Sequence, residues 1–199
     1  MLLVVVLASC ARRPPDPPPV AVWPTDRATC FAALGRERVA FTDWLDAPTV
    51  DVCAVPAPVV VQASTAAMTP ILQTSCPMML AWARFEPELQ RLASRRLGSE
   101  IARIHHYGSY NCRRMSGNQR RMSLHSTGQA LDISGFTTAD GRYISVRDGW
   151  RGRRDEAAFL RDLGQAACRH FNVVLTPNHD RAHRDHIHVD IGPWRFCGA

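Results

Sequence analysis

The sequence predicts an α+β domain in which a small, mostly antiparallel sheet is flanked by helices. Three observations carry this prediction: one long helix-forming stretch, several short segments that alternate apolar and polar residues, and turn residues that separate these segments. The 199 residues fit one globular domain with a short N-terminal appendage, because a domain commonly holds about 100–200 residues. Strands and helices that share one core give the α+β class.

The N-terminus begins with a short apolar run that ends in Leu7-Ala8-Ser9-Cys10. This pattern resembles a bacterial lipoprotein signal, so we expect a signal peptide over 1–9 and lipidation of Cys10. The alternative is an apolar terminus that carries a cysteine by chance. Residues 10–25 are rich in proline and are expected to form an extended tether, which leaves 26–199 as the domain. The protein would then be lipid-anchored at the periplasmic face of the cell envelope.

The strongest helical signal covers residues 76–97. Thr74 or Ser75 can cap its start, Pro77 suits its first turn, and Gly98 can end it. Pro87 is expected to kink this helix. Upstream, a short helix is expected around 30–34 and a strand at 59–61.

The second half of the chain predicts strands before and after one further helix. We expect a strand over 101–110, then a hairpin of 133–136 with 143–146 joined by Ala-Asp-Gly-Arg. An amphipathic helix is expected over 155–170, followed by a strand over 171–175.

Cysteine content predicts disulfide bonds. Apart from Cys10, six of the seven cysteines remain, and six cysteines in an exported chain suggest three disulfides among fifteen possible pairings. No C-x-x-C motif occurs, so cysteine ligation of a metal is disfavoured. We favour Cys30–Cys53, since both lie in the N-terminal segment and could close it as a unit. The remaining pairs are expected, more weakly, to be Cys76–Cys168 and Cys112–Cys197.

The net charge of +6 comes entirely from arginine, because the chain contains no lysine. A basic protein favours anionic partners. The arginines are scattered and form no nucleic-acid motif, so we expect no nucleic-acid binding and interpret the charge as a surface suited to an anionic envelope.

Two polar motifs predict a metal site. The first is S-x-H-x-x-G-x-A-x-D over 123–132, and the second is H-x-x-H-x-H-x-D over 183–190. Residues two apart on a strand share a face, so each motif can present polar side chains on one face and apolar ones on the other. Catalytic zinc commonly has three His or acidic ligands and one open position. We therefore assign His125, Asp132 and His188 as zinc ligands.

The two motifs together resemble zinc peptidases that cut peptidoglycan, namely D-alanyl-D-alanine carboxypeptidases and murein endopeptidases. The run from Cys76 through Tyr110-Asn111-Cys112-Arg113 to Cys197 more closely resembles the bacterial extensin-like C-terminal family. This resemblance covers roughly 26–199 and implies a hedgehog/DD-peptidase-like fold.

The resemblance also implies roles for residues around the metal. An arginine at the position of Arg113 binds substrate carboxylate in such peptidases; an ordinary surface arginine is the alternative. His186 is the candidate transition-state stabiliser or proton shuttle, and Asp185 the candidate base, although strand alternation would turn Asp185 away from the metal. His183 repeats the endopeptidase pattern.

Two further polar residues accompany the motifs. Ser123 is grouped with the substrate-binding candidates but is expected to hydrogen-bond its loop, and Asp190 either orients a ligand histidine or is a solvated carboxylate. The polar loop 114–122 is expected to overhang the metal. The function expected is a zinc-dependent hydrolase of peptidoglycan peptide bonds; the alternative is a zinc-stabilised domain that binds wall polymer or an envelope protein without hydrolysis.

Overall fold

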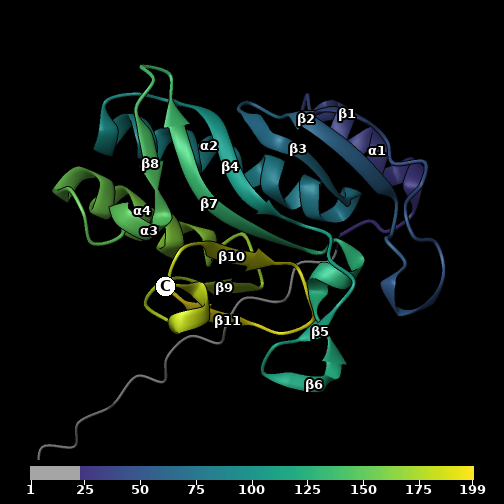
Figure 1. Cartoon of the computed structure of the whole chain (residues 1–199). Helices are drawn as coiled ribbons and strands as arrows, with labels where there is room; N and C mark the ends of the chain where they lie inside the picture. Colours follow the sequence, from purple (N-terminus) through teal and green to yellow (C-terminus); the bar gives the residue numbers. More distant parts are fainter. Residues whose placement is uncertain (1–22) are drawn as a thin grey trace, which may run out of the picture.

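The computed structural model describes residues 23–199 and shows one nine-stranded mixed sheet with helices packed against it (Figure 1). This confirms the α+β class. The signal peptide, the lipidation site Cys10 and most of the proline-rich tether lie outside the described residues, so those expectations stay predictions. None of the helices in the described part has the length and apolar character needed to cross a membrane.

The helices are α1 (Arg27–Arg36), α2 (Cys76–Leu97), α3 (Val146–Gly149) and α4 (Arg154–Ala167), with three short 3-10 helices, η1 (Asp51–Cys53), η2 (Leu124–Thr127) and η3 (Arg181–His183). The strands are β1 (Ala40–Asp43), β2 (Pro58–Ala63), β3 (Ala67–Ser75), β4 (Ile101–Gly108), β5 (Arg114–Met115), β6 (Asn118–Met122), β7 (Ala130–Thr138), β8 (Tyr143–Ser145), β9 (Val173–Leu175), β10 (Ile187–Asp190) and β11 (Phe196–Gly198).

Strand order in the main sheet is β1-β2-β3-β4-β7-β10-β9-β11, and β8 pairs with β7 beyond the end of β10. Pairing is antiparallel except between β3 and β4 and between β9 and β11. The long helix α2 contacts both α1 and α4, and these helices lie behind the sheet in Figure 1. The sheet is therefore mostly antiparallel, as predicted. Strands β7 and β10 are neighbours near the middle of the sheet.

Helix α2 has the predicted bounds. Its first turn is capped by Ser75, whose Oγ accepts a hydrogen bond from the N–H of Met78 at 3.3 Å. It ends at Gly98, which adopts the left-handed conformation with φ of 74°. The helix continues through Pro87 and buries Trp82 and Phe85 completely or nearly so. This apolar face supplies much of the core.

The second half of the domain also follows the predicted order. Strands β7 and β8 form the expected hairpin, with Phe136 opposite Ile144. Leu131 and Ile133 of β7 are buried in the core, whereas Asp132 between them is only partly buried. The alternation on β7 therefore places the Asp132 carboxylate on the face away from the core. Further along the chain, helix α4 ends at Ala167, three residues before the predicted end at 170.

The disulfides confirm that six cysteines are bonded, but all three predicted pairings are wrong. The structure has Cys30–Cys76, Cys53–Cys112 and Cys168–Cys197, with Cα–Cα distances of 6.1, 5.6 and 5.5 Å. The physical reason is packing between distant segments. Helix α1 lies against α2 and η1 contacts η2, while β11 pairs with β9, which contacts α4. Closeness in sequence was therefore a poor guide to the partner of Cys30, which bonds to Cys76 rather than Cys53.

The segment 114–122 was expected to be a loop, and this is also wrong. Strands β5 and β6 form a separate two-stranded sheet that projects from the molecule (Figure 1). The guanidinium of Arg121 lies 4.9 Å from the ring centroid of Trp194. This cation–π contact ties the ribbon to the segment after β10.

Candidate metal centre

Strand register brings two of the predicted ligands together. His188 of β10 lies directly opposite Asp132 of β7 in the antiparallel pair, so both side chains leave the same face of the sheet. His188 Nδ1 lies 2.8 Å from Asp132 Oδ1. The alternation of side chains along each strand therefore predicted that Asp132 and His188 would lie together.

The third predicted ligand, His125, comes from η2 and reaches the same place. Its Nε2 lies 3.2 Å from His188 Nδ1 and 3.2 Å from Asp132 Oδ2. These three side chains form the group suited to hold a metal ion in the described part of the chain, with one donor atom from each lying within 4.8 Å of the others. The sequence-based ligand set is thus brought together as a cluster.

Local structure around η2 explains how His125 is placed. The side chain of Ser123 caps η2 by accepting the N–H of His125 at 3.3 Å. Gly128 ends η2 with φ of 62°, and a Cβ there would lie 2.9 Å from the backbone nitrogen of Ser75. Its carbonyl accepts the Ser75 N–H and hydroxyl at 3.1 and 2.8 Å. The glycine of the first motif therefore fixes η2 against the start of α2.

A backbone carbonyl determines the tautomer of His125. Nδ1 lies 2.9 Å from the carbonyl oxygen of Ser109, and a carbonyl oxygen can only accept a hydrogen bond. Nδ1 therefore carries a proton, and in the neutral ring the lone pair of Nε2 points toward Asp132 and His188. Ligand histidines in metal proteins are commonly oriented in this way through their second nitrogen.

The carboxylate of Asp190 contacts the second ring nitrogen of His188 in a similar way. Its Oδ2 lies 3.4 Å from His188 Nε2, and its Oδ1 accepts the backbone N–H of Gly192 at 2.9 Å. If a cation took the place of the proton beside Nδ1, Asp190 would accept the proton of the neutral His188 ring at Nε2 and leave the Nδ1 lone pair for the cation. Asp190 is buried, so the orienting role weighed from sequence fits better than that of a solvated carboxylate.

The donor set fits a small divalent cation. His125 Nε2, His188 Nδ1 and the two carboxylate oxygens of Asp132 lie 2.8 to 3.2 Å from their neighbours in this group, an arrangement that is repulsive unless a positive charge lies among them. Tetrahedral zinc with bonds of about 2.0–2.1 Å places its donors about 3.3 Å apart. Two imidazole nitrogens and one carboxylate oxygen are also ligands that zinc accepts.

The electrostatics of the cluster point the same way. Burial opposes the charge on Asp132, but hydrogen bonds with His125 and His188 hold the pKa of its carboxyl well below the usual range. Burial also opposes a charged His188, yet Asp132 and Asp190 raise its pKa to about 9. Without a metal, a proton therefore occupies this position, and a bound cation would displace it.

The family model described as "Extensin-like protein C-terminus" matches residues 28–198. The chain belongs to this family. No curated protein and no solved structure matched it. The match covers the whole sheet, the three disulfides and both metal motifs of this extensin-like domain.

His186 of the extensin-like domain lies beside the cluster without being one of its three donors. Its Nε2 is 3.6 Å from Asp132 Oδ1, and its Nδ1 is 3.0 Å from Asp185 Oδ1. Asp185 precedes β10 and turns toward Arg147, whose Nη2 lies 3.3 Å from Asp185 Oδ2. Asp185 thus contacts His186 rather than the three ligands in the described contacts. His186 therefore directs Nδ1 toward Asp185 and Nε2 toward Asp132.

His183 packs behind this pair. Its ring centroid lies 5.1 Å from that of His186 and 5.9 Å from that of His188. Its Nδ1 lies 2.8 Å from Asp180 Oδ1. Burial lowers the pKa of His183 despite that carboxylate, so the ring is a neutral packing partner for His186.

Arg113 is not brought to the cluster in the described contacts. It is exposed, and its Nη1 lies 3.4 Å from both the Arg114 carbonyl and Ser116 Oγ, within its own turn. Ser123, the other substrate-binding candidate, acts as the cap of η2 described above. Its expected role of hydrogen-bonding its own loop is confirmed.

Sequence reasoning missed three contributors to the site. The Ser109 carbonyl belongs to the backbone, so no side-chain pattern reports it. Tyr107 lies with its ring edge-on to His186 at 5.8 Å between centroids, and it belonged to neither polar motif. Arg147, from α3, was part of no motif.

Proposed function

We propose that the protein is a zinc-dependent hydrolase of peptide bonds in peptidoglycan, held at the cell envelope. The observation that carries the proposal is the convergence of donor atoms from His125, Asp132 and His188 beside a third imidazole, that of His186, which is not one of the three ligands. A purely structural zinc site is usually closed by four protein ligands. Here three donors converge, and the neighbouring side chain is a proton carrier.

His125, Asp132 and His188 would hold the ion. When bound there, zinc supplies a Lewis acid for the scissile carbonyl and lowers the pKa of a coordinated water to about 7. The Ser109 carbonyl and the Asp190 carboxylate keep the two imidazoles in the tautomers that present lone pairs to the ion.

His186 would move the proton. Asp185 accepts from Nδ1 of His186, so Nε2 of the neutral ring is free to take a proton from the attacking water. The protonated ring can then stabilise the negative charge that develops on the carbonyl oxygen and deliver its proton to the leaving amine. Asp185 and Arg147 orient the ring, and His183 packs against it.

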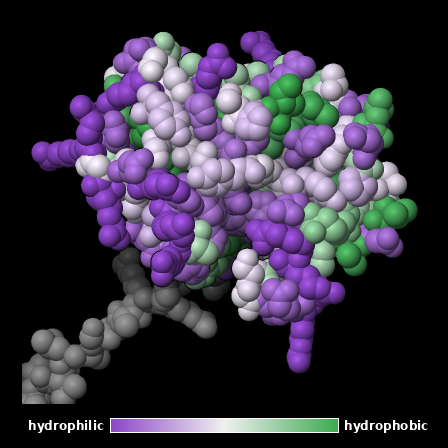
Figure 2. All heavy atoms as spheres, in the orientation of Figure 1, coloured by the Kyte–Doolittle hydropathy of each residue, from purple (hydrophilic) through white to green (hydrophobic). Residues whose placement is uncertain are grey.

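The substrate class rests on the resemblance of the two motifs to zinc carboxypeptidases and endopeptidases of the bacterial wall. The basic charge of the chain suits an anionic envelope, and hydrophilic residues cover most of the face seen in Figure 2. The lipoprotein-like N-terminus would anchor the domain to a membrane through Cys10 and place it next to this polymer.

The test has two stages. Elemental analysis of the purified domain should give about one zinc per chain, which the double substitution His125→Ala, His188→Ala removes. Zinc-loaded protein should then cleave purified cross-linked muropeptides, and the products are identified by chromatography and mass spectrometry. The His186→Ala protein should retain zinc and lose this cleavage. Absence of zinc uptake would overturn the proposal. Zinc binding with wall binding but no cleavage, by wild type and His186→Ala alike, would support a binding domain instead.

A further inference from the structure

An aromatic row, made of Tyr107, His105 and Tyr143, lies on the face of the sheet that the helices leave open. The helices are behind the sheet in Figure 1, so this face is toward the viewer. Tyr107 of β4 and Tyr143 of β8 are 61 and 55% exposed. Single exposed rings are common on protein surfaces, but these rings are linked to one another and to the metal centre. They therefore form one continuous surface.

A glycine of β7 makes room for the Tyr143 ring. A Cβ on Gly135 would lie 2.9 Å from the Tyr143 hydroxyl oxygen and 3.1 Å from its Cε2, so the ring lies against the bare backbone of β7. His105, opposite Gly135 in the register of β4 with β7, meets the Tyr143 ring at 5.0 Å between centroids and 87° between planes. Gly135 is three residues from Asp132, which puts this end of the row about 10 Å from the metal position.

Tyr107 joins the row to the metal centre. Its ring centroid lies 5.8 Å from that of His186, with 75° between the planes, and His186 Nε2 lies 3.6 Å from Asp132 Oδ1. Partial burial raises the pKa of the Tyr107 phenol, and the charges of Asp185 and Tyr143 add to this rise, so both residues are close to it. The aromatic row thus runs without a break from Tyr143 to the proposed proton carrier.

The aromatic row is amphipathic rather than purely apolar. Neither phenol hydroxyl has a hydrogen-bond partner within residues 23–199, so both are available to a ligand. His105 Nε2 lies 2.8 Å from Thr137 Oγ1, and partial burial lowers the pKa of this histidine. A tyrosine presents an apolar ring and one polar tip. The matching ligand should therefore offer C–H surface with hydroxyl or amide groups around its rim.

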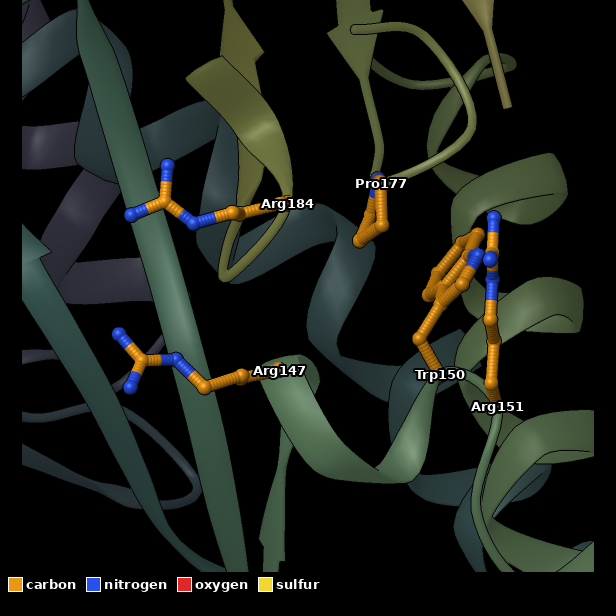
Figure 3. Close-up of a pocket in the computed structure, with 5 residues that line it drawn as sticks. All are labelled: Arg147, Trp150, Arg151, Pro177 and Arg184. Carbon is orange, nitrogen blue, oxygen red and sulfur yellow. The ribbon is translucent and has the colours of Figure 1, made fainter. Parts of the chain in front are cut away.

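The charges next to the aromatic row disfavour a cationic ligand. Figure 3 shows the side chains of Arg147 and Arg184 extending toward the same side, and their positive charges oppose the rise in the pKa of Tyr107. Asp185, the carboxylate near Tyr107, already pairs with Arg147 at 3.3 Å. A neutral, polyhydroxylated ligand fits these surroundings better than a basic one.

We infer that the aromatic row binds the glycan of the wall polymer, with sugar rings stacked on Tyr107 and Tyr143. The inference rests on the proposed function and adds that the site selects peptides that are still attached to sugar. A β-linked N-acetylated amino sugar carries its hydroxyl and amide groups around the rim of its ring and presents C–H groups from its faces. These C–H groups match the electron-rich faces of aromatic side chains. Because the row continues to His186, a bound sugar would lie next to the peptide at the metal position.

The first test uses glycan without peptide. The probe is tetra-N-acetylchitotetraose, which shares the β-linked N-acetylated sugar rings of the wall and carries no peptide to be cut. Calorimetry with the purified protein should detect binding that Tyr107→Ala and Tyr143→Ala each weaken about threefold or more, and the double substitution about tenfold or more, because each removes a stacking surface. The double substitution to phenylalanine keeps both rings and should bind within about threefold of the parent.

Phe196→Ala is the matched control, because it removes a 50% exposed ring from β11, at the edge of the sheet. It should leave binding of the probe unchanged, and thermal unfolding checks that every variant is folded. The inference is overturned if the parent does not bind the probe, if the double alanine variant binds as well as the parent, or if Phe196→Ala loses as much affinity. It is also overturned if the peptide without sugar binds the row as tightly as the intact muropeptide.

The glycan site and the proposed function can fail separately. Zinc-dependent cleavage of muropeptides without binding of the probe would leave the proposed function standing and remove the glycan site. Binding of the probe through the two tyrosines without any cleavage would do the reverse. Where both hold, the double alanine variant should lower kcat/KM for the muropeptide about tenfold and leave that for the same peptide without sugar unchanged.

Discussion

Replacing Asp190 by asparagine tests how the metal site is preorganised. The oxygen that accepts the Gly192 N–H can be reproduced by the new amide oxygen, whereas the group 3.4 Å from His188 Nε2 becomes an NH₂ donor. Nε2 must then accept a hydrogen bond, so the proton of neutral His188 moves to Nδ1, the atom that should bind the metal. Substitution therefore changes the tautomer while it conserves shape.

The expected result of Asp190→Asn is zinc binding weakened about 10- to 100-fold, which is the usual cost of losing such an orienting carboxylate. This corresponds to about 1.4–2.7 kcal/mol. Zinc affinity is measured by competition with a chromophoric chelator, and thermal unfolding of the metal-free protein checks that the buried substitution leaves the fold intact.

Asp185→Asn is the matched control, because Asp185 contacts a histidine that is not among the three ligands. It should change zinc affinity by less than about threefold while it slows muropeptide cleavage. If Asp190→Asn binds zinc as tightly as the wild type in a folded protein, the tautomer argument is refuted. If Asp185→Asn loses zinc instead, the assignment of ligands is refuted.

Three stability predictions follow from other parts of the structure. Gly128→Ala should lower the free energy of unfolding by about 1–3 kcal/mol in urea titrations, since φ is 62° and the new Cβ would meet Ser75 N at 2.9 Å; an unchanged midpoint would contradict this. Phe159→Ala, at a fully buried position of α4, should cost about 3–5 kcal/mol, and a loss below about 1 kcal/mol would mean that the core is not packed there. The hydrogen bond from Arg142 lowers the pKa of Asp155 to about 2, so the stability from this pair is present above about pH 4 and is lost as pH falls through about 2. Because the two side chains are 27 and 31% exposed, solvent screening limits the effect of Asp155→Asn to less than about 1 kcal/mol at pH 7, and an effect that persists at pH 2 would contradict the mechanism.

Prediction from sequence succeeded where one local rule governs the structure. Helix α2 carries its own cap, first-turn proline and terminal glycine, so its bounds were readable. The ligands Asp132 and His188 were readable because alternation along a strand fixes which side chains share a face. His125 was included because its motif lies only a few residues before β7.

Prediction failed where distant segments meet through packing. The carbonyl of Ser109 orients His125 from 16 residues away, and no residue type encodes that contact. The contact of Arg147 with Asp185 joins α3 to the turn before β10 over 38 residues of sequence, and neither polar motif predicts it. The strands β5 and β6 were not predicted because most of their residues are polar and the two methionines, Met115 and Met122, set up no alternation.

The order of the cysteines along the chain has a consequence for how the protein acquires its cross-links. Cys53 lies between Cys30 and Cys76 in sequence, and Cys76 lies between Cys53 and Cys112, so the first two native bonds interleave. Oxidation of cysteines in the order in which they emerge would first join Cys30 to Cys53, a non-native bond. Thiol–disulfide exchange must undo it before the sheet can close. Productive maturation should therefore depend on an isomerase as well as an oxidase, whereas the C-terminal Cys168–Cys197 bond, formed between consecutive cysteines, needs only the latter.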